Sequence, residues 1–189
     1  MKYELKLNTS EFNIGVIVAR FQVDDLHEAH RDLIDTVRKN HSKLVIMLGL
    51  PFIESTPNDP LDFLTRKMMI QEYVPEAIIL PIKDTRDDKI WSDNLDTSLK
   101  LIFKDSDKIL LYGSRDSFTK RYFGKLDTCY LISENPTLSG TEVRKLASKK
   151  VINSRDFRAG VIYQAFCSRP VLYPTVDIVA YKGDNILLC

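Results

Sequence analysis

The sequence predicts an α/β protein built on a doubly wound parallel sheet. Five short segments consist mostly of apolar residues, and longer segments with apolar residues at helical spacing lie between them. Continuous apolar runs are typical of strands that are covered on both faces. Strands that alternate with helices in this way indicate a parallel sheet with helices on both sides.

The predicted elements follow one another along the chain without a longer internal repeat. The first strand is VIVA, directly after Gly15, and the helix that follows it covers residues 29–40. The remaining predicted strands are residues 44–50, 77–82, 108–113 and 128–132. The remaining predicted helices are residues 63–73, 92–103, 139–149 and 154–168.

Sheets of this type bind ligands beyond the carboxyl ends of their strands, close to the point where the strand order reverses. Function is therefore expected in the five segments that follow the predicted strands. These segments are residues 19–22, 49–57, 83–91, 113–115 and 133–141. Directly after the third of them, Ser92 or Asp93 is expected to cap the next helix.

Length and composition bound the possible functions. At 189 residues the chain can hold one α/β domain and a small appendage. Its 27 Lys and Arg residues against 26 Asp and Glu leave a net charge of +1, so the overall charge favours neither nucleic acid nor a membrane surface as a partner. No apolar run approaches the roughly 18 residues of a membrane helix.

The cysteines indicate a reducing compartment. Cys129, Cys167 and Cys189 are far apart, odd in number and without the spacing of a zinc site. The N-terminus has no apolar segment of the signal-peptide type, so a cytoplasmic protein is expected. The sequence leaves the oligomeric state open, and a homo-oligomer is compatible with it.

The pattern changes after the last predicted helix. Residues 169–174 read as a linker between a first domain over residues 1–168 and a β-hairpin over residues 175–189. The hairpin turn is expected at residues 182–185, around Gly183. Because the last residues are apolar and lie within a strand, we expect the hairpin to be the truncated start of a further domain.

Two of the three histidines stand at the start of the first predicted helix. His27 and His30 are three residues apart and therefore share one face of that helix. A helix N-terminus presents unpaired N–H groups to an anion, so the pair, together with the preceding Arg20, fits a polyphosphate. The alternative is a surface helix start with incidental histidines, and the position of Arg20 at a strand tip favours the first interpretation.

A second motif, LSGTEVR, follows the last predicted strand. Ser139 and Glu142 match a capping box, which explains a helix start there. Gly140 would leave the first-turn amides open. The hydroxyls of Ser139 and Thr141 and the guanidinium of Arg144 would then bind a phosphate. The capping and phosphate-binding interpretations are compatible.

Together the two motifs resemble those of the nucleotidyltransferase superfamily. ARFQ at residues 19–22 with HEAH at residues 27–30 is similar to its HxGH motif, and SGTEVR at residues 139–144 is similar to its ISSTxxR motif. Within the superfamily, the chain most resembles the adenylyltransferase domain of bifunctional nicotinamide mononucleotide adenylyltransferase/Nudix hydrolase. Further similar segments are residues 60–70, 92–95 and 113–116, and residues 175–189 resemble the opening strands of a Nudix domain.

Some positions depart from the family pattern. Ala19 and Ala29 stand where the family usually has glycine, and residues 23–26 make the turn between them longer. Asp96 takes a place where relatives often have a tryptophan that stacks on nicotinamide, and Trp91 is the candidate substitute. The chain contains no Nudix box, so we expect no hydrolase activity from it.

The resemblance implies a Rossmann-like fold of the nucleotidyltransferase type and an activity. The phosphate of nicotinamide mononucleotide (NMN) would attack the α-phosphorus of ATP, forming NAD and releasing pyrophosphate. Such a reaction requires alignment and charge stabilisation rather than a covalent protein intermediate. Mg²⁺ is expected to be carried by the ATP phosphates rather than by a cage of protein ligands.

The resemblance also implies roles for single residues. The catalytic residues would be His30, His27 and Arg144. The ATP-binding residues would be Arg20, Phe21, Gln22, Gly113, Arg115, Ser139, Gly140 and Thr141. The acceptor-binding residues would be Arg66, Trp91, Asp93 and Asn94.

Two alternatives stay open. Another nucleotidyltransferase would use a different phosphorylated acceptor, such as phosphopantetheine or glycerol phosphate. A domain with impaired catalysis would bind nucleotide and serve as a regulator. A dehydrogenase with a similar sheet is disfavoured, because the first strand is not followed by G-x-G-x-x-G.

Overall fold

The structure is a computed structural model that describes residues 8–113, 118–131, 140–149, 154–167, 180–182 and 185–187. The chain forms two compact units, Met1–Lys149 and Lys150–Cys189. Within the described residues, no helix has the length and apolar character that would let it cross a bilayer.

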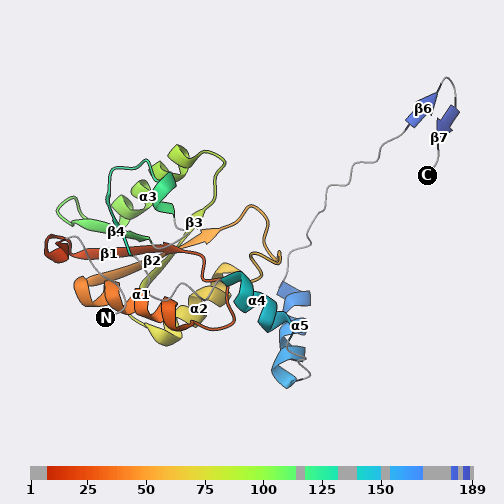
Figure 1. Cartoon of the computed structure of the whole chain (residues 1–189), viewed down its shortest axis with the longest axis horizontal. Helices are drawn as coiled ribbons and strands as arrows, with labels where there is room; N and C mark the ends of the chain where they lie inside the picture. Colours follow the sequence, from red (N-terminus) through yellow and green to blue (C-terminus); the bar gives the residue numbers. More distant parts are fainter. Residues whose placement is uncertain are drawn as a thin grey trace. The chain divides into compact units, whose positions relative to one another are not determined.

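Five parallel strands form the sheet of the first unit (Figure 1). They are β1 (Ile14–Ala19), β2 (Lys43–Leu50), β3 (Ile78–Lys83), β4 (Ile109–Gly113) and β5 (Asp127–Tyr130). The strand order is β3-β2-β1-β4-β5, and every neighbouring pair is parallel. The order reverses between β1 and β4, which confirms the prediction of a doubly wound parallel sheet.

Helices cover both faces of the sheet. On one face lie α1 (Glu28–Asn40) and α2 (Phe63–Tyr73), and on the other lies α3 (Asp88–Ile102) (Figure 1). Successive strand residues point to opposite faces, so Ile46 of β2 packs in the core under α1 and α2, whereas Met47 packs in the core under α3. The continuous apolar runs of the sequence follow from this double coverage.

Three shorter helical elements complete the described part of the first unit. They are η1 (Thr9–Glu11), η2 (Phe118–Arg121) and α4 (Gly140–Ser148). With α3 as the exception, the ends of the predicted elements agree with the structure to within about two residues, the usual scatter of element ends.

The start of α3 differs from the prediction. Neither Ser92 nor Asp93 caps this helix, because Asp87 does: its carboxylate accepts hydrogen bonds from the N–H groups of Lys89 and Ile90 at 2.8 and 3.0 Å. Ser92 lies inside the helix, and its hydroxyl donates to the carbonyl of Asp88. The charged segment before Trp91, which reads as a loop, therefore supplies the cap and the first turn.

The second unit contains α5 (Arg155–Cys167) and the predicted hairpin. In the hairpin, β6 (Ala180–Lys182) pairs antiparallel with β7 (Asn185–Leu187). The predicted linker over residues 169–174 lies outside the described residues.

At the amino edge of the sheet, β1 and the end of α1 approach each other closely. A Cβ on Gly15 would clash with the side chains of His41 and Val37, so the position requires glycine. The Nδ1 atom of His41 lies 2.9 Å from the carbonyl oxygen of Phe12, and its Nε2 atom lies 2.6 Å from the hydroxyl of Tyr112. Because a carbonyl only accepts, Nδ1 carries the proton and Tyr112 donates to Nε2.

Replacing Gly15 with alanine is expected to destabilise the first unit by about 1–3 kcal/mol, because the added methyl group overpacks the contact with His41. Urea unfolding followed by the fluorescence of Trp91, the single tryptophan, measures this change. Gly160→Ala in α5 is the control, since a Cβ there meets no atom within 4 Å. Equal unfolding midpoints for the two variants would contradict the close approach.

Candidate functional site

The chain turns sharply at the carboxyl end of β1. Phe21, two residues beyond the strand, has a φ of 48°, in the left-handed region that non-glycine residues rarely adopt. This conformation costs on the order of 1 kcal/mol. It is held in place because the Phe21 ring is 2 % exposed and meets the imidazole of His30 edge-on, with 4.8 Å between ring centroids. The ring thus connects the end of β1 to the start of α1.

The two histidines of the first motif are in direct contact. His27 is the N-cap residue of α1, and its carbonyl accepts hydrogen bonds from the N–H groups of His30 and Arg31 at 2.9 and 3.1 Å. The imidazoles of His27 and His30 stack with 3.6 Å between centroids. In the part of the chain that the structure describes, the Nδ1 atoms of both rings are buried and lack a hydrogen-bond partner. Buried polar atoms without partners are rare, and at a strand tip they indicate a ligand position.

Burial sets the charge of this pair. Burial and, to a smaller extent, the charge of the neighbouring His27 together lower the pKa of His30 to about 3. Burial also lowers the pKa of His27. Both rings are therefore neutral near neutral pH, and each offers one N–H donor and one lone pair.

A cavity of about 330 Å³ lies beside His30. It combines residues from the tip of β1, from α1, from the segment before α2 and from the start of α4. The lining residues are Arg20, Phe21, Gln22, Val23, His30, Asn58, Asp59, Gly140 and Arg144. The structure thus brings together the two sequence motifs, which are more than a hundred residues apart, as Arg144 and Gln22 show by their contact.

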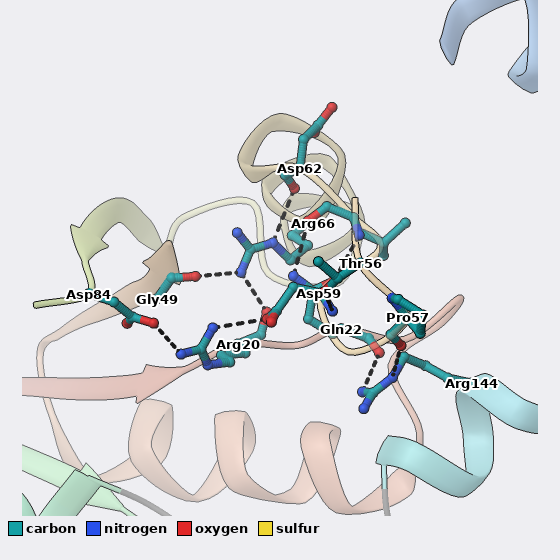
Figure 2. A network of polar contacts seen from close by, with 11 residues as sticks. Arg20, Gln22, Gly49, Thr56, Pro57, Asp59, Asp62, Arg66, Asp84 and Arg144 are labelled. Carbon is teal, nitrogen blue, oxygen red and sulfur yellow. Dashed lines mark hydrogen bonds and ion pairs between the residues drawn. The ribbon is translucent and has the colours of Figure 1, made fainter. Parts of the chain in front are cut away.

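Arg20 is held between two carboxylates (Figure 2). Its Nη1 donates to Asp59 at 2.9 Å, and its Nη2 donates to Asp84 at 2.5 Å. Arg20 is 44 % exposed, and both carboxylates are less exposed than the arginine. The two bonds occupy the outer edge of the guanidinium, the edge that would otherwise bind a phosphate.

Arg144 reaches from α4 to two main-chain carbonyls (Figure 2). Its Nε donates to the carbonyl of Pro57 at 3.1 Å, and its Nη1 donates to the carbonyl of Gln22 at 3.2 Å. Its Nη2 donates to the hydroxyl of Thr141 at 3.2 Å. The part of the second motif that the structure describes, residues 140–144, is therefore bonded to the tip of β1 through Arg144.

The side chain of Gln22 is also engaged with protein. It is buried, its Nε2 donates to the carbonyl of Leu61 at 3.0 Å, and its Oε1 accepts from the N–H of Leu61 at 2.8 Å. Both ends of the amide are satisfied by one residue, so the contacts of Gln22 in this structure hold the loop before α2.

Arg66 is almost completely buried, at 1 % exposure. Its Nη1 donates to the carbonyls of Arg20 and Gly49 at 2.8 and 3.0 Å, and its Nε donates to the carbonyl of Asp62 at 3.1 Å (Figure 2). Asp62 in turn caps α2 by accepting from the N–H of Thr65 at 2.7 Å. The guanidinium therefore ties together the ends of β1 and β2 and the start of α2.

The other predicted acceptor-binding residues do not line the cavity. Trp91 packs on Phe118, with 5.7 Å between ring centroids, against the core under α3. Asp93 and Asn94 are exposed on α3. Among the predicted ATP-binding residues, Gly113 is buried at the end of β4, and Arg115 and Ser139 lie outside the described residues.

Asp96 has a structural role that the sequence did not reveal. Its buried carboxylate accepts hydrogen bonds from the hydroxyl of Tyr122 and from the N–H of Lys125, at 2.5 and 2.7 Å. Ser92, one turn earlier, accepts from the N–H of Phe123 at 3.0 Å. Asp96, at the position where relatives often have a tryptophan, therefore holds the segment before β5 against α3.

Two residues of the site, Asp59 and Asp84, were missed by sequence reasoning. Asp84 lies in the segment of residues 83–91, and Asp59 lies two residues beyond the segment of residues 49–57; this place after a predicted strand is the signal that could have pointed to them. Their pairing with Arg20, 39 and 64 residues away in sequence, depends on the sheet order.

The lowered pKa of His30 predicts acid sensitivity of the fold. In the unfolded chain this histidine titrates near 6.5, whereas in the fold its pKa is about 3. As the pH falls through 6.5, His30 becomes protonated in the unfolded state, whereas in the folded state it stays neutral. His30 therefore lowers the free energy of unfolding by up to about 1.4 kcal/mol per pH unit between about pH 6 and pH 4.

Urea unfolding of the wild type and of His30→Gln across this pH range measures that contribution. The stability curve of the variant is expected to fall less steeply with acid than that of the wild type. Parallel curves would show that His30 titrates normally in the fold.

No family model and no curated protein sequence matches the chain. Solved structures do match. A bifunctional NMN adenylyltransferase/ADP ribose pyrophosphatase from Francisella tularensis matches with a TM-score of 0.64 and 20% identity, over 82% of this chain and 50% of that chain. A structure of such a bifunctional enzyme from Francisella tularensis with AMP and a manganese ion matches with a TM-score of 0.64 and 22% identity, over 82% and 49%.

NadR protein in complex with NAD and AMP-PNP matches with a TM-score of 0.56 and 13% identity, over 74% of this chain and 43% of that chain. This chain thus spans about half the length of the bifunctional enzymes that it matches. At these identities the likeness concerns the fold. The sheet order and these matches show a Rossmann-like α/β fold, as the sequence predicts.

Proposed function

We propose that this chain is a nucleotidyltransferase that joins ATP and NMN to give NAD and pyrophosphate. The observation that carries the proposal is the cavity at the reversal of strand order. There the buried His30, whose Nδ1 has no hydrogen-bond partner among the described residues, lies with two arginines and the start of α4. Imidazole, guanidinium and open helix amides are groups that bind a polyphosphate.

The chemistry of adenylyl transfer suits such a set of residues. A phosphate oxygen of NMN attacks the α-phosphorus of ATP in line, the bond between the α-phosphorus and the bridging oxygen breaks, and pyrophosphate leaves with that oxygen. The protein forms no covalent bond in this step. It lowers the barrier by aligning the two phosphates and by stabilising charge as it shifts to the leaving group.

Five residues take defined parts in this proposal. His30 donates a hydrogen bond to the α-phosphate, and His27 holds a neighbouring oxygen. Arg20 and Arg144 bind the β- and γ-phosphates. The amides of the first turn of α4, which begins at Gly140, face the same triphosphate and add the partial positive charge of a helix N-terminus.

Mg²⁺ enters with ATP in this proposal and supplies charge neutralisation for the leaving pyrophosphate. Within the described residues, no group of three or more His, Cys, Asp or Glu side chains has the geometry to hold a metal ion. The ATP phosphates and water would therefore be its main ligands. A matching crystal structure contains AMP together with a manganese ion, which supports a divalent cation beside the nucleotide.

The acceptor would lie along the carboxyl edge of the sheet, next to ATP. Asp93 and Asn94 are exposed in the early turns of α3, which starts just beyond β3 and therefore at this edge. Trp91 would have to leave its contact with Phe118 to stack on a nicotinamide ring. We retain these residues as the acceptor-binding candidates, with Arg66 acting through the carbonyls that it holds.

A second candidate function is nucleotide binding without transfer. The observation that favours it is the pairing of Arg20 with both Asp59 and Asp84, which takes up one N–H group on each terminal nitrogen of this arginine. A pyrophosphate-release assay beside calorimetry with ATP separates the two functions, because a binding module takes up ATP and releases no pyrophosphate.

In that assay His30→Ala is expected to lower kcat by about 10²- to 10³-fold with ATP and NMN, the typical loss for one transition-state donor. His41→Gln is the matched control, because His41 is a half-buried histidine that bonds Phe12 and Tyr112 at the opposite edge of the sheet. Thermal unfolding of both variants checks that each is folded. Turnover by His30→Ala near the wild-type rate would refute the assignment of His30.

A panel of phosphorylated acceptors in the same assay tests the substrate. The proposal expects NMN to give the highest kcat/KM. Preference for another phosphorylated small molecule would keep the nucleotidyltransferase assignment and replace the acceptor.

A further inference from the structure

The loop over residues 56–62 bonds to Arg20 and Gln22 from the first motif and to Arg144 from the second. Figure 2 shows that Arg20, Gln22 and Arg144 all bond to this loop, and that Arg66 bonds to its last residue, Asp62. The residues with which a triphosphate would be held are therefore bonded to one short piece of the same chain.

The contacts at the carboxyl end of the loop form a fixed anchor. Leu61 exchanges two hydrogen bonds with the buried amide of Gln22, and Asp62 both caps α2 and accepts from the buried Arg66. Breaking these bonds would leave buried polar groups unsatisfied, which costs about 1–3 kcal/mol for each group. This end of the loop stays in place when a ligand enters.

The contacts in the middle of the loop are of a different kind. Asp59 bonds to Arg20 at 2.9 Å, and the carbonyl of Pro57 bonds to Arg144 at 3.1 Å. Both arginines are at least partly exposed, and both line the cavity together with Asp59. Both bonds are solvent-exposed, and exposed ion pairs and hydrogen bonds contribute little to stability, so these two bonds can be exchanged for bonds to a ligand at little cost.

A triphosphate and the middle of the loop compete for the same donors. The N–H of Arg20 Nη1 that bonds to Asp59 cannot bond to a phosphate oxygen at the same time, and Nε of Arg144 is occupied by Pro57. The carboxylate of Asp59 would also repel a phosphate held by Arg20. Entry of the anion therefore favours departure of Asp59 from Arg20.

We infer that residues 56–59 are a latch that closes the empty site by occupying Arg20 and Arg144, and that binding of the triphosphate releases it. The inference rests on the proposed function, because it takes a polyphosphate to be the ligand of these arginines. Asp59 is then the residue that sets the free-energy cost of releasing residues 56–59 from the arginines. The anchor at Leu61 and Asp62 limits the movement to the middle of the loop.

The test uses the full chain, inorganic tripolyphosphate as the probe, and two variants. Asp59→Asn removes the carboxylate that belongs to the loop, whereas Asp84→Asn removes an equal charge from Arg20 and leaves the loop bond in place. Hydrogen exchange of the Asp59 amide, which bonds to the carbonyl of Thr56 at 3.1 Å, reports on the latch. Calorimetry with tripolyphosphate reports on binding.

Without ligand, exchange at Asp59 is expected to be about fivefold faster in a variant that has lost the latch. Since an aspartate carboxylate slows hydroxide-catalysed exchange of its own amide, the rates are compared as protection factors against the intrinsic rate of each residue. On that scale Asp59→Asn should show this increase and Asp84→Asn should not. In the wild type, saturating tripolyphosphate should produce the same increase. Asp59→Asn should also bind tripolyphosphate about fivefold more tightly than the wild type.

The outcomes separate the latch from the function. Binding of tripolyphosphate with unchanged or slower exchange at Asp59 would overturn the latch and leave the phosphate site standing. Equal exchange in the two variants without ligand would also overturn it. If neither the wild type nor Asp59→Asn binds tripolyphosphate, the proposed function fails and the latch falls with it.

Discussion

The site depends on one buried cation. Arg66 places a guanidinium between the ends of two neighbouring strands and the first turn of α2, where it bonds to three main-chain carbonyls. A charge buried at this depth is tolerated only when its N–H groups are satisfied, and carbonyl dipoles satisfy them here. The ends of β1 and β2 and the start of α2 are therefore fixed relative to one another by a single side chain.

The rest of the site builds on this contact. The carbonyl of Arg20, bonded by Arg66, directly precedes Phe21, whose left-handed backbone turns the chain toward α1. The ring of Phe21 then meets His30, and His30 stacks on His27. The position of the histidine pair thus follows from a chain of contacts that begins at Arg66, although the arginine touches neither ring in the described contacts.

The sequence was sufficient for the sheet because burial on both faces leaves a strong local signal. Continuous apolar runs can be read without knowing which strand pairs with which. The start of α3 was missed because a segment with several aspartates contains more than one potential cap, and only the structure shows that Asp87 accepts from the first-turn N–H groups. Local signals of this kind identify the element and leave its end open.

The site was predictable only in part, for a related reason. Arg20, His30, Gly140 and Arg144 stand in short motifs, and the cavity brings these residues together. The partners of the arginines were not predictable, because Asp59, Asp84 and the carbonyls of Arg20 and Gly49 come from segments far away in the sequence and carry no pattern of their own. The predicted roles of Arg115 and Ser139 stay predictions, since both residues lie outside the described ranges.

The empty cavity carries little uncompensated charge. The histidine pair is neutral because burial lowers both pKa values, and the two carboxylates, Asp59 and Asp84, balance the charges of Arg20 and Arg144. On the proposed function, a site of this kind avoids the cost of holding several cations close together without a ligand. Of the parts that must be oriented before the reaction, Arg66 and Phe21 are buried, and the partly exposed histidine pair is held by its stacking and by the contact of His30 with Phe21. The part that must yield, the middle of the 56–62 loop, is held by exposed bonds. The buried side chains of Arg66 and Phe21 therefore fix the geometry of the site. The exposed bonds in the middle of the 56–62 loop set the free-energy cost of binding the anion.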